Sequence, residues 1–68
     1  MKRYTESEVR NWLEARVRKD GIARVAADLD VSVTWIRATR SGVAGISEKV
    51  AEGLGFEKLP DSYVKRAH

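Results

Sequence analysis

Two arginines in a stretch without acidic residues are the side chains of this sequence best suited to binding a ligand. No Asp or Glu lies between Val31 and Ser47, whereas Arg37 and Arg40 fall inside that window. A guanidinium is a planar fork of N–H donors that matches a phosphate or the edge of a guanine. The formal net charge of +3 also suits a polyanionic partner, although many inert small domains carry such a charge.

The remaining residue types give little support for catalysis or metal binding. The chain has 0 cysteines and 1 histidine, His68. Disulfides and thiolate metal sites are therefore excluded, and a zinc site or a histidine-based triad would need more ligands or bases. No nucleophile–base pair or phosphate-binding loop is visible. We therefore expect a protein that is not an enzyme, without metal, cofactor or small-molecule substrate.

Length and composition favour one small globular domain over residues 1–68. Hydrophobic residues make up 43% of the chain and charged residues 34%, which is too apolar for intrinsic disorder. No apolar run approaches the length of a membrane span, and no apolar stretch follows Lys2 and Arg3 as in a signal peptide. We therefore expect a cytoplasmic protein that does not bind membranes.

A first helix is predicted to begin after Thr5, because Thr5 and Glu8 have the spacing of a capping box. One apolar stripe follows at helical spacing, formed by Val9, Trp12, Leu13 and Val17. Gly21 is expected to end this helix in a left-handed cap.

Two short helices with a tight turn between them are predicted to position the arginines. The first runs from Ile22 to Leu29, and the second begins after the N-cap Ser32 and ends at Ser41–Gly42. Asp30 tolerates positive φ, so it can form the bend between them. This is the layout of a helix-turn-helix, here over residues 22–42, with the arginine-bearing face of the second helix turned to solvent.

Up to Gly55, the rest of the chain is predicted to form a loop over residues 43–45 and one further helix. A fourth short helix begins after Ser47, and Gly53 within it costs about 1 kcal/mol relative to alanine. Residues 62–66 fit a short edge strand, a last helical turn or a loose tail. We therefore predict an all-α domain of four to five helices, with at most a short C-terminal strand or tail.

The stretch from Val25 to Arg37, VAADLDVSVTWIR, resembles the helix-turn-helix of the phage Cro and lambda-repressor-like family. The run from Ile46 to Gly55 also looks like short prophage regulators of this kind, so the resemblance covers about residues 9–55. Two positions depart from the family pattern. Asp30 stands where glycine is usual, which predicts a more strained turn, and Thr39 stands where an aliphatic residue is usual, which predicts looser packing behind the second helix.

The resemblance implies a sequence-specific transcriptional regulator, a Cro-type repressor that binds double-stranded DNA through the major groove as a homodimer on a palindromic operator. It also implies that the protein is located in the cytoplasm of a bacterial host cell, associated with the nucleoid. By position it places the base-facing and phosphate-facing residues at Ser32, Val33, Thr34, Arg37, Ala38, Arg40, Ser41, Arg24 and Lys49. Residues 56–68 are expected to form the dimer contact, through Phe56, Leu59, Tyr63 and Val64.

Three alternatives stay open from the sequence. The same fold also serves as a protein-interaction module, such as an antitoxin-like or adaptor domain, because helix-turn-helix geometry does not require DNA binding. Trp35 either covers the helix junction or stacks on a sugar or a partner chain, and the structural role is favoured. Arg40 is equally compatible with an ordinary surface charge.

Overall fold

A computed structural model describes residues 2–66, in which four helices are joined to a three-stranded antiparallel sheet. The helices are α1 (Glu6–Asp20), α2 (Ile22–Leu29), α3 (Val33–Ser41) and α4 (Glu48–Gly53). The strands are β1 (Arg3–Tyr4), β2 (Phe56–Lys58) and β3 (Tyr63–Lys65), in the order β1-β3-β2. The all-α prediction is therefore wrong, and the fold is mixed α/β.

Helix α1 begins as the capping box predicts. The Glu8 amide donates to Thr5 Oγ1 over 3.2 Å, and the Thr5 amide donates to Glu8 Oε1 over 3.0 Å. The helix ends at Gly21, whose φ of 88° is positive but whose ψ of 148° lies outside the left-handed helical region that was expected. Gly21 thus turns the chain directly into α2 through a conformation that favours glycine.

The bend between α2 and α3 is confirmed at Asp30, which adopts φ 56° and ψ 46°. Ser32 caps α3 by accepting a hydrogen bond from the Trp35 amide. Behind α3, Thr39 is fully buried, and its hydroxyl donates to the Trp35 carbonyl over 2.9 Å. The predicted loose packing at Thr39 is therefore wrong, because its hydroxyl is satisfied within its own helix while its methyl group joins the core.

The sheet arises from the residues before α1 and from the segment after Gly55, of which only residues 62–66 had a strand among their expected structures. Residues 63–65 form β3, which is the central strand and not an edge, since it pairs with β1 (Tyr4 opposite Tyr63) and with β2 (Phe56 opposite Lys65). Strands of two or three residues are too short to display the alternation from which a strand is predicted. Burial of Tyr63 raises the pKa of its phenol, and the negative charge of the Glu6 carboxylate raises this pKa further.

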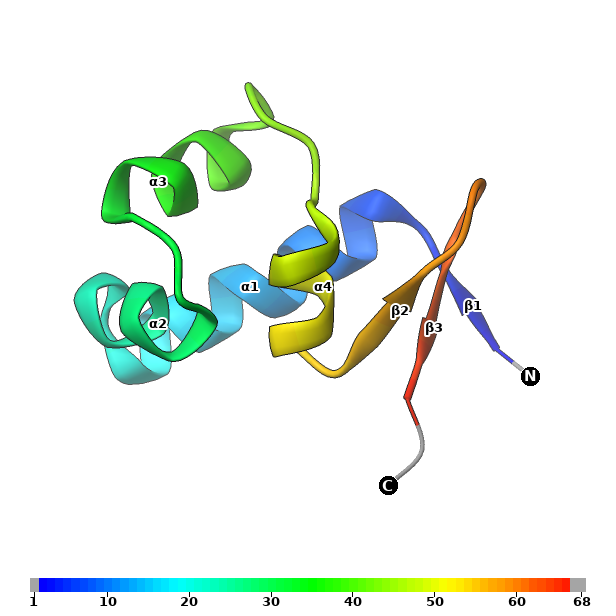
Figure 1. Cartoon of the computed structure of the whole chain (residues 1–68), viewed down its shortest axis with the longest axis horizontal. Coiled ribbons are helices and arrows are strands. Elements are labelled where there is room, and N and C mark those ends of the chain that lie inside the picture. Colours follow the sequence, from blue (N-terminus) through cyan, green and yellow to red (C-terminus); the bar gives the residue numbers. More distant parts are fainter. Residues whose placement is uncertain (1, 67–68) are drawn as a thin grey trace.

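Figure 1 shows α2 and α3 at one end of the molecule, the sheet at the other, and α1 running between them. The core follows α1 along this axis. Its fully buried members of largest volume are Phe56, Leu13, Ile36, Ile46, Val9, Val25, Val50 and Thr39. Phe56 connects the sheet to α1, because its ring packs edge-on against Tyr4 of β1 at 5.1 Å and against Trp12 of α1 at 5.8 Å between centroids. Within residues 2–66, no helix has the length and apolar character needed to cross a membrane.

Candidate nucleic-acid interface

Helix α3 presents a polar outer face, because Ile36 and Thr39 hold its opposite face in the core. At helical spacing this leaves Thr34, Arg37 and Ser41 exposed to solvent. Ser32, Val33 and Ala38 complete the surface, with Ser32 exposed and the other two partly covered. The structure thus brings together six of the nine residues that were expected to contact DNA. We call these six residues the α3 face.

Arg37 is the positive charge at the α3 face, and its guanidinium is not neutralised by a neighbour. It is exposed and takes part in no salt bridge or side-chain hydrogen bond with another residue of the 2–66 range. Of the arginines in this range, Arg66 alone shares the absence of a salt bridge. The donors of Arg37 are therefore available to a ligand at no cost of breaking an ion pair.

Arg40 is held against α1 and is not directed toward a ligand. Its Nε lies 2.7 Å from Glu14 Oε2 and its Nη2 lies 2.9 Å from Glu14 Oε1, a bidentate ion pair. The hydrogen bond from Arg40 lowers the pKa of Glu14, and the same bond raises the pKa of Arg40. Its expected place among the DNA-binding residues is not supported by this geometry, which instead makes Arg40 a brace between α3 and α1.

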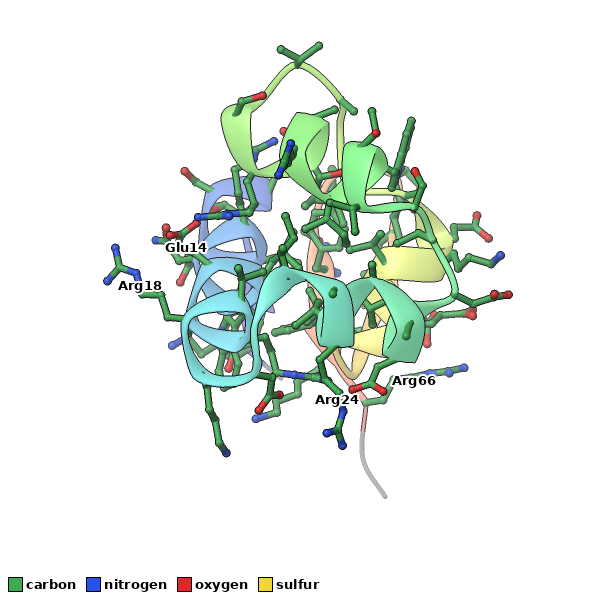
Figure 2. All side chains as sticks on the ribbon, turned by 90° about the vertical axis from the view of Figure 1, so that its left-hand side faces the viewer. Glu14, Arg18, Arg24 and Arg66 are labelled. Atoms are coloured by element: carbon green, nitrogen blue, oxygen red, sulfur yellow. The ribbon has the colours of Figure 1, made fainter. Side chains whose placement is uncertain are left out.

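Lys49 and Arg24 also lie apart from the α3 face. The Lys49 ammonium contacts the Asp30 carbonyl oxygen at 3.1 Å and Asp30 Oδ2 at 3.3 Å, so it supports the bend between the two helices. Arg24 lies 3.7 Å from Asp28 Oδ2 on its own helix. Figure 2 shows Arg24 on the side of the molecule opposite α3. Neither residue joins the surface around Arg37.

Arg10 of α1 is a structural residue of this region that the sequence did not reveal. Its Nε donates to the Thr39 carbonyl over 2.8 Å, and its Nη2 lies 3.4 Å from Glu6 Oε2. The bond satisfies a carbonyl in the last turn of α3, where helix carbonyls lack intrahelical partners. Arg10 and Arg40 therefore fasten α3 to α1 at two points. No local signal reports this, because the partners are 29 and 26 residues apart.

Two of the four residues expected to form a dimer contact are part of the core. Phe56 is fully buried and Tyr63 is 5% exposed, whereas Leu59 and Val64 are partly exposed. The last two residues of the expected 56–68 segment lie outside the described range. This region is thus an integral part of the sheet, and Phe56 and Tyr63 have no free surface to offer a second chain.

Trp35 and Val43 are the apolar residues exposed near this surface. Trp35 is 40% exposed and Val43, in the loop after α3, is 85% exposed. Trp35 therefore covers the helix junction less completely than its expected structural role implies. Among residues 2–66 there is no group of three His, Cys, Asp or Glu side chains that would hold a metal ion.

Comparisons with known proteins identify no relative of this chain. No protein-family model matches the chain, and no curated protein or solved structure matches it either.

Proposed function

We propose that this chain is a sequence-specific DNA-binding regulator that places the α3 face in the major groove of double-stranded DNA. In this proposal Arg37 reads a guanine edge, and Thr34 and Ser41 donate to or accept from bases or phosphates. Val33 and Ala38 offer apolar contact to thymine methyl groups. The protein acts as a homodimer on a two-fold-symmetric operator, as a Cro-type repressor in the bacterial cytoplasm.

The observation that carries the proposal is the position of the uncompensated guanidinium. Arg10, Arg16, Arg18 and Arg40 each lie within 3.5 Å of a carboxylate oxygen, so α1 and its neighbours carry little net field. Arg37 has no such partner, and α3 carries no acidic residue. Arg37 thus places an uncompensated positive charge on a helix face that is polar, small and supported from behind.

Support from behind matters because base recognition requires a helix of fixed orientation. The bend at Asp30 fixes the angle at which α3 leaves α2, and Lys49 bridges that bend from α4. Arg10 and Arg40 hold the last turn of α3 from α1. A surface preorganised in this way loses little conformational entropy when it docks into a groove.

The test begins with selection of bound sequences from a random duplex library, using the intact chain. We expect a consensus with two-fold symmetry. On the selected site, Arg37→Ala is expected to lose about 1–3 kcal/mol and to relax preference at one base pair. Arg66→Ala is the matched control, because it removes the same charge from a residue that also has no salt bridge within residues 2–66 and that lies far from α3 in Figure 2.

Salt dependence separates DNA binding from binding to a protein partner. The logarithm of the binding constant is expected to fall linearly with the logarithm of salt concentration, with a slope of about −0.9 for each phosphate contacted. If Arg37→Ala and Arg66→Ala weaken binding equally at every site, the reading of bases by Arg37 is refuted.

The exposure of Trp35 and Val43 favours one second candidate, a protein-interaction module on the same scaffold. Apolar side chains left in solvent are typical of surfaces that bind another protein. In that case duplex selection yields no consensus. Binding of the partner then depends on Trp35 and changes little with salt.

A further inference from the structure

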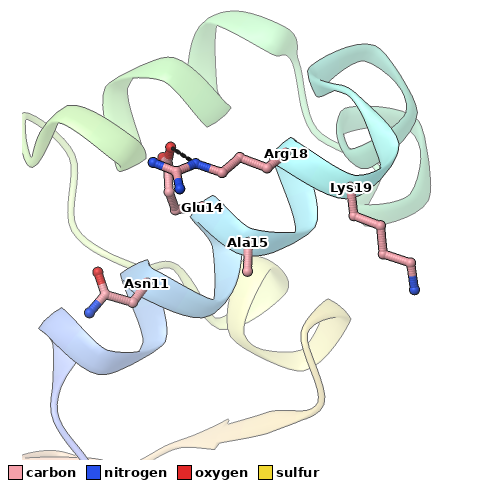
Figure 3. A pocket seen from close by; sticks show the side chains of 5 residues that line it. All are labelled: Asn11, Glu14, Ala15, Arg18 and Lys19. Carbon is pink, nitrogen blue, oxygen red and sulfur yellow. Dashed lines mark ion pairs between the residues drawn. The ribbon is translucent and has the colours of Figure 1, made fainter.

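The outer face of α1 is a second surface that the proposed function does not use. Its members lie opposite the buried Val9, Leu13 and Val17. They are Glu8, Asn11, Trp12, Glu14, Ala15, Arg18 and Lys19, and we call them the α1 face. Two shallow depressions lie along this face, and Asn11 and Ala15 line both of them. Figure 3 shows the second depression from close by.

The α1 face is complementary to a second copy of itself. Its acidic residue Glu8 lies in the first turn, and its basic residues Arg18 and Lys19 lie in the last turn of the same helix. Glu14, near the middle of the helix, is already paired with Arg18 and Arg40. Two such helices packed antiparallel place Glu8 of each copy opposite Lys19 of the other. The midpoint of the face is Asn11 and Ala15, which are small enough for two helices to approach closely.

Trp12 supplies the apolar area that such a contact needs. Its ring is 42% exposed although one edge packs on Phe56, and the Lys65 ammonium lies 4.4 Å from the ring centroid. In an antiparallel pair centred near Leu13–Glu14, Trp12 of one copy lies beside Ala15 of the other. The exposed indole is thereby covered by the smallest residue of the face.

The direction of the α1 face fits a dimer that binds a two-fold-symmetric operator. Figure 2 shows α3 across the top of the molecule, while Glu14 and Arg18 of α1 extend to the side. A two-fold axis that runs beside α1, parallel to the direction in which α3 faces, makes the two α1 helices antiparallel. The same axis leaves both α3 faces on one side of the pair, as binding to two half-sites requires.

The sheet edges offer a poorer contact for a second copy. Edge strand β1 has two residues, and edge strand β2 has three, of which Glu57 and Lys58 are charged and exposed. Short, charged edges disfavour pairing with another strand. Of the apolar residues of the hairpin, the two large aromatic residues, Phe56 and Tyr63, are buried, and only Leu59 and Val64 are partly exposed.

We propose that a second copy of this chain binds antiparallel to the α1 face and that this contact forms the dimer. The proposal rests on the proposed function only in its two-fold symmetry, since the contact itself involves no DNA. Helix α1 has 15 residues and spans about 22 Å, so the buried area is below that of a standard interface. The free dimer is therefore weak, with a dissociation constant above about 1 µM.

Sedimentation equilibrium of the intact chain at low salt tests the contact. We expect reversible self-association as the concentration rises toward about 1 mM. Ala15→Glu places a bulky charge at the centre of the α1 face and is expected to weaken association at least tenfold. Ala27→Glu makes the same change at an exposed position of α2 and is expected to leave association unchanged. Helical circular dichroism confirms that both variants fold.

Charge reversal tests the antiparallel register. Glu8→Lys alone and Lys19→Glu alone each place like charges opposite one another and weaken association, whereas the double variant restores it. Glu8→Lys also removes the hydrogen bond from the Thr5 amide to the Glu8 carboxylate at the start of α1, but a loss of stability from that cause is not repaired by Lys19→Glu. Recovery of association in the double variant therefore reports the contact between copies.

The outcomes separate this inference from the proposed function. A chain that remains monomeric near 1 mM, or that associates equally well with Ala15→Glu and Ala27→Glu, overturns the α1 contact even when it binds duplex DNA. A chain that associates through α1 but selects no DNA consensus retains the contact and loses the proposed function.

Discussion

Gly53→Ala is a substitution whose effect is expected to run against helix propensity. Gly53 is the last residue of α4, and a methyl group there overlaps Leu29 Cδ2 and lies 3.3 Å from Leu29 Cγ. Alanine is favoured over glycine within a helix by about 1 kcal/mol. Overpacking a core costs about 1–3 kcal/mol. The structure therefore predicts a net loss of up to about 2 kcal/mol.

The overpacking cost is expected to prevail because Leu29 has little room to move. Its side chain is 3% exposed, and the next residue is Asp30, whose left-handed conformation fixes the bend before α3. A domain of 68 residues has a free energy of unfolding of about 3–10 kcal/mol. A loss of 1 kcal/mol lowers the melting temperature of a domain this size by about 4–8 °C.

The two opposing effects are measured separately by urea denaturation of four variants, which are Gly53→Ala, Ala27→Gly, Leu29→Val and the double variant of Leu29→Val with Gly53→Ala. Ala27→Gly, at an exposed position of α2, gives the propensity term in this domain. Leu29→Val shortens the side chain that meets the new methyl group, so it is expected to cost less with Gly53→Ala than alone, by about 0.5–3 kcal/mol of coupling. A Gly53→Ala variant that is more stable than the parent, with additive Leu29→Val, would refute the close approach of α4 to α2.

Three further predictions concern the frame around α3. Ending the chain after Leu59 removes the central strand β3 and is expected to abolish cooperative thermal unfolding, as measured by circular dichroism. A truncated chain that still folds, even as a monomer, would contradict this expectation. The lowered pKa of Glu14 means that its pair with Arg40 stabilises the domain above its ordinary pKa of 4.5, and that this contribution is lost as pH falls through the lower folded value. Urea midpoints from pH 7 to pH 3 should therefore fall less steeply in Glu14→Gln, and parallel curves would dismiss the pair. Thr5→Ala is expected to cost about 1 kcal/mol through loss of the cap, which unchanged urea midpoints would disprove.

The helices could be predicted from the sequence because their signals are local. The cap of α1 requires two residues three positions apart, and both hydrogen bonds are present between Thr5 and Glu8. The bend at Asp30 depends on the φ preference of one residue. Each of these features is decided within one helical turn, so no knowledge of distant residues is needed.

The sheet could not be predicted because its pairing is not local. Strand β1 consists of Arg3 and Tyr4, and its partner β3 lies about sixty residues away along the chain. Two residues have no periodicity, so only the partner makes them a strand. Phe56 and Tyr63 were candidate contact residues for a second chain because the sequence does not show that α1 and the sheet enclose them.

Charge pairing explains why only part of the candidate site was predictable. Arg37 and Arg40 occupy the same acid-free window of the sequence, three residues apart. Residues three apart lie on the same side of a helix, so the spacing alone does not distinguish the two side chains. Arg40 meets Glu14 of α1, whereas Arg37 meets no carboxylate.

The ion pairs of Arg10 and Arg40 also determine how the basic surface should be interpreted. A net charge of +3 distributed evenly would give weak, nonspecific attraction along the whole molecule. Here the arginines that fasten α3 are neutralised by Glu6 and Glu14. Their contribution to DNA binding is therefore rigidity and not charge. It follows that charge removal at Arg37 should change base preference, whereas breaking the Arg40–Glu14 pair should weaken all sequences alike by loosening the helix that carries the reading residues.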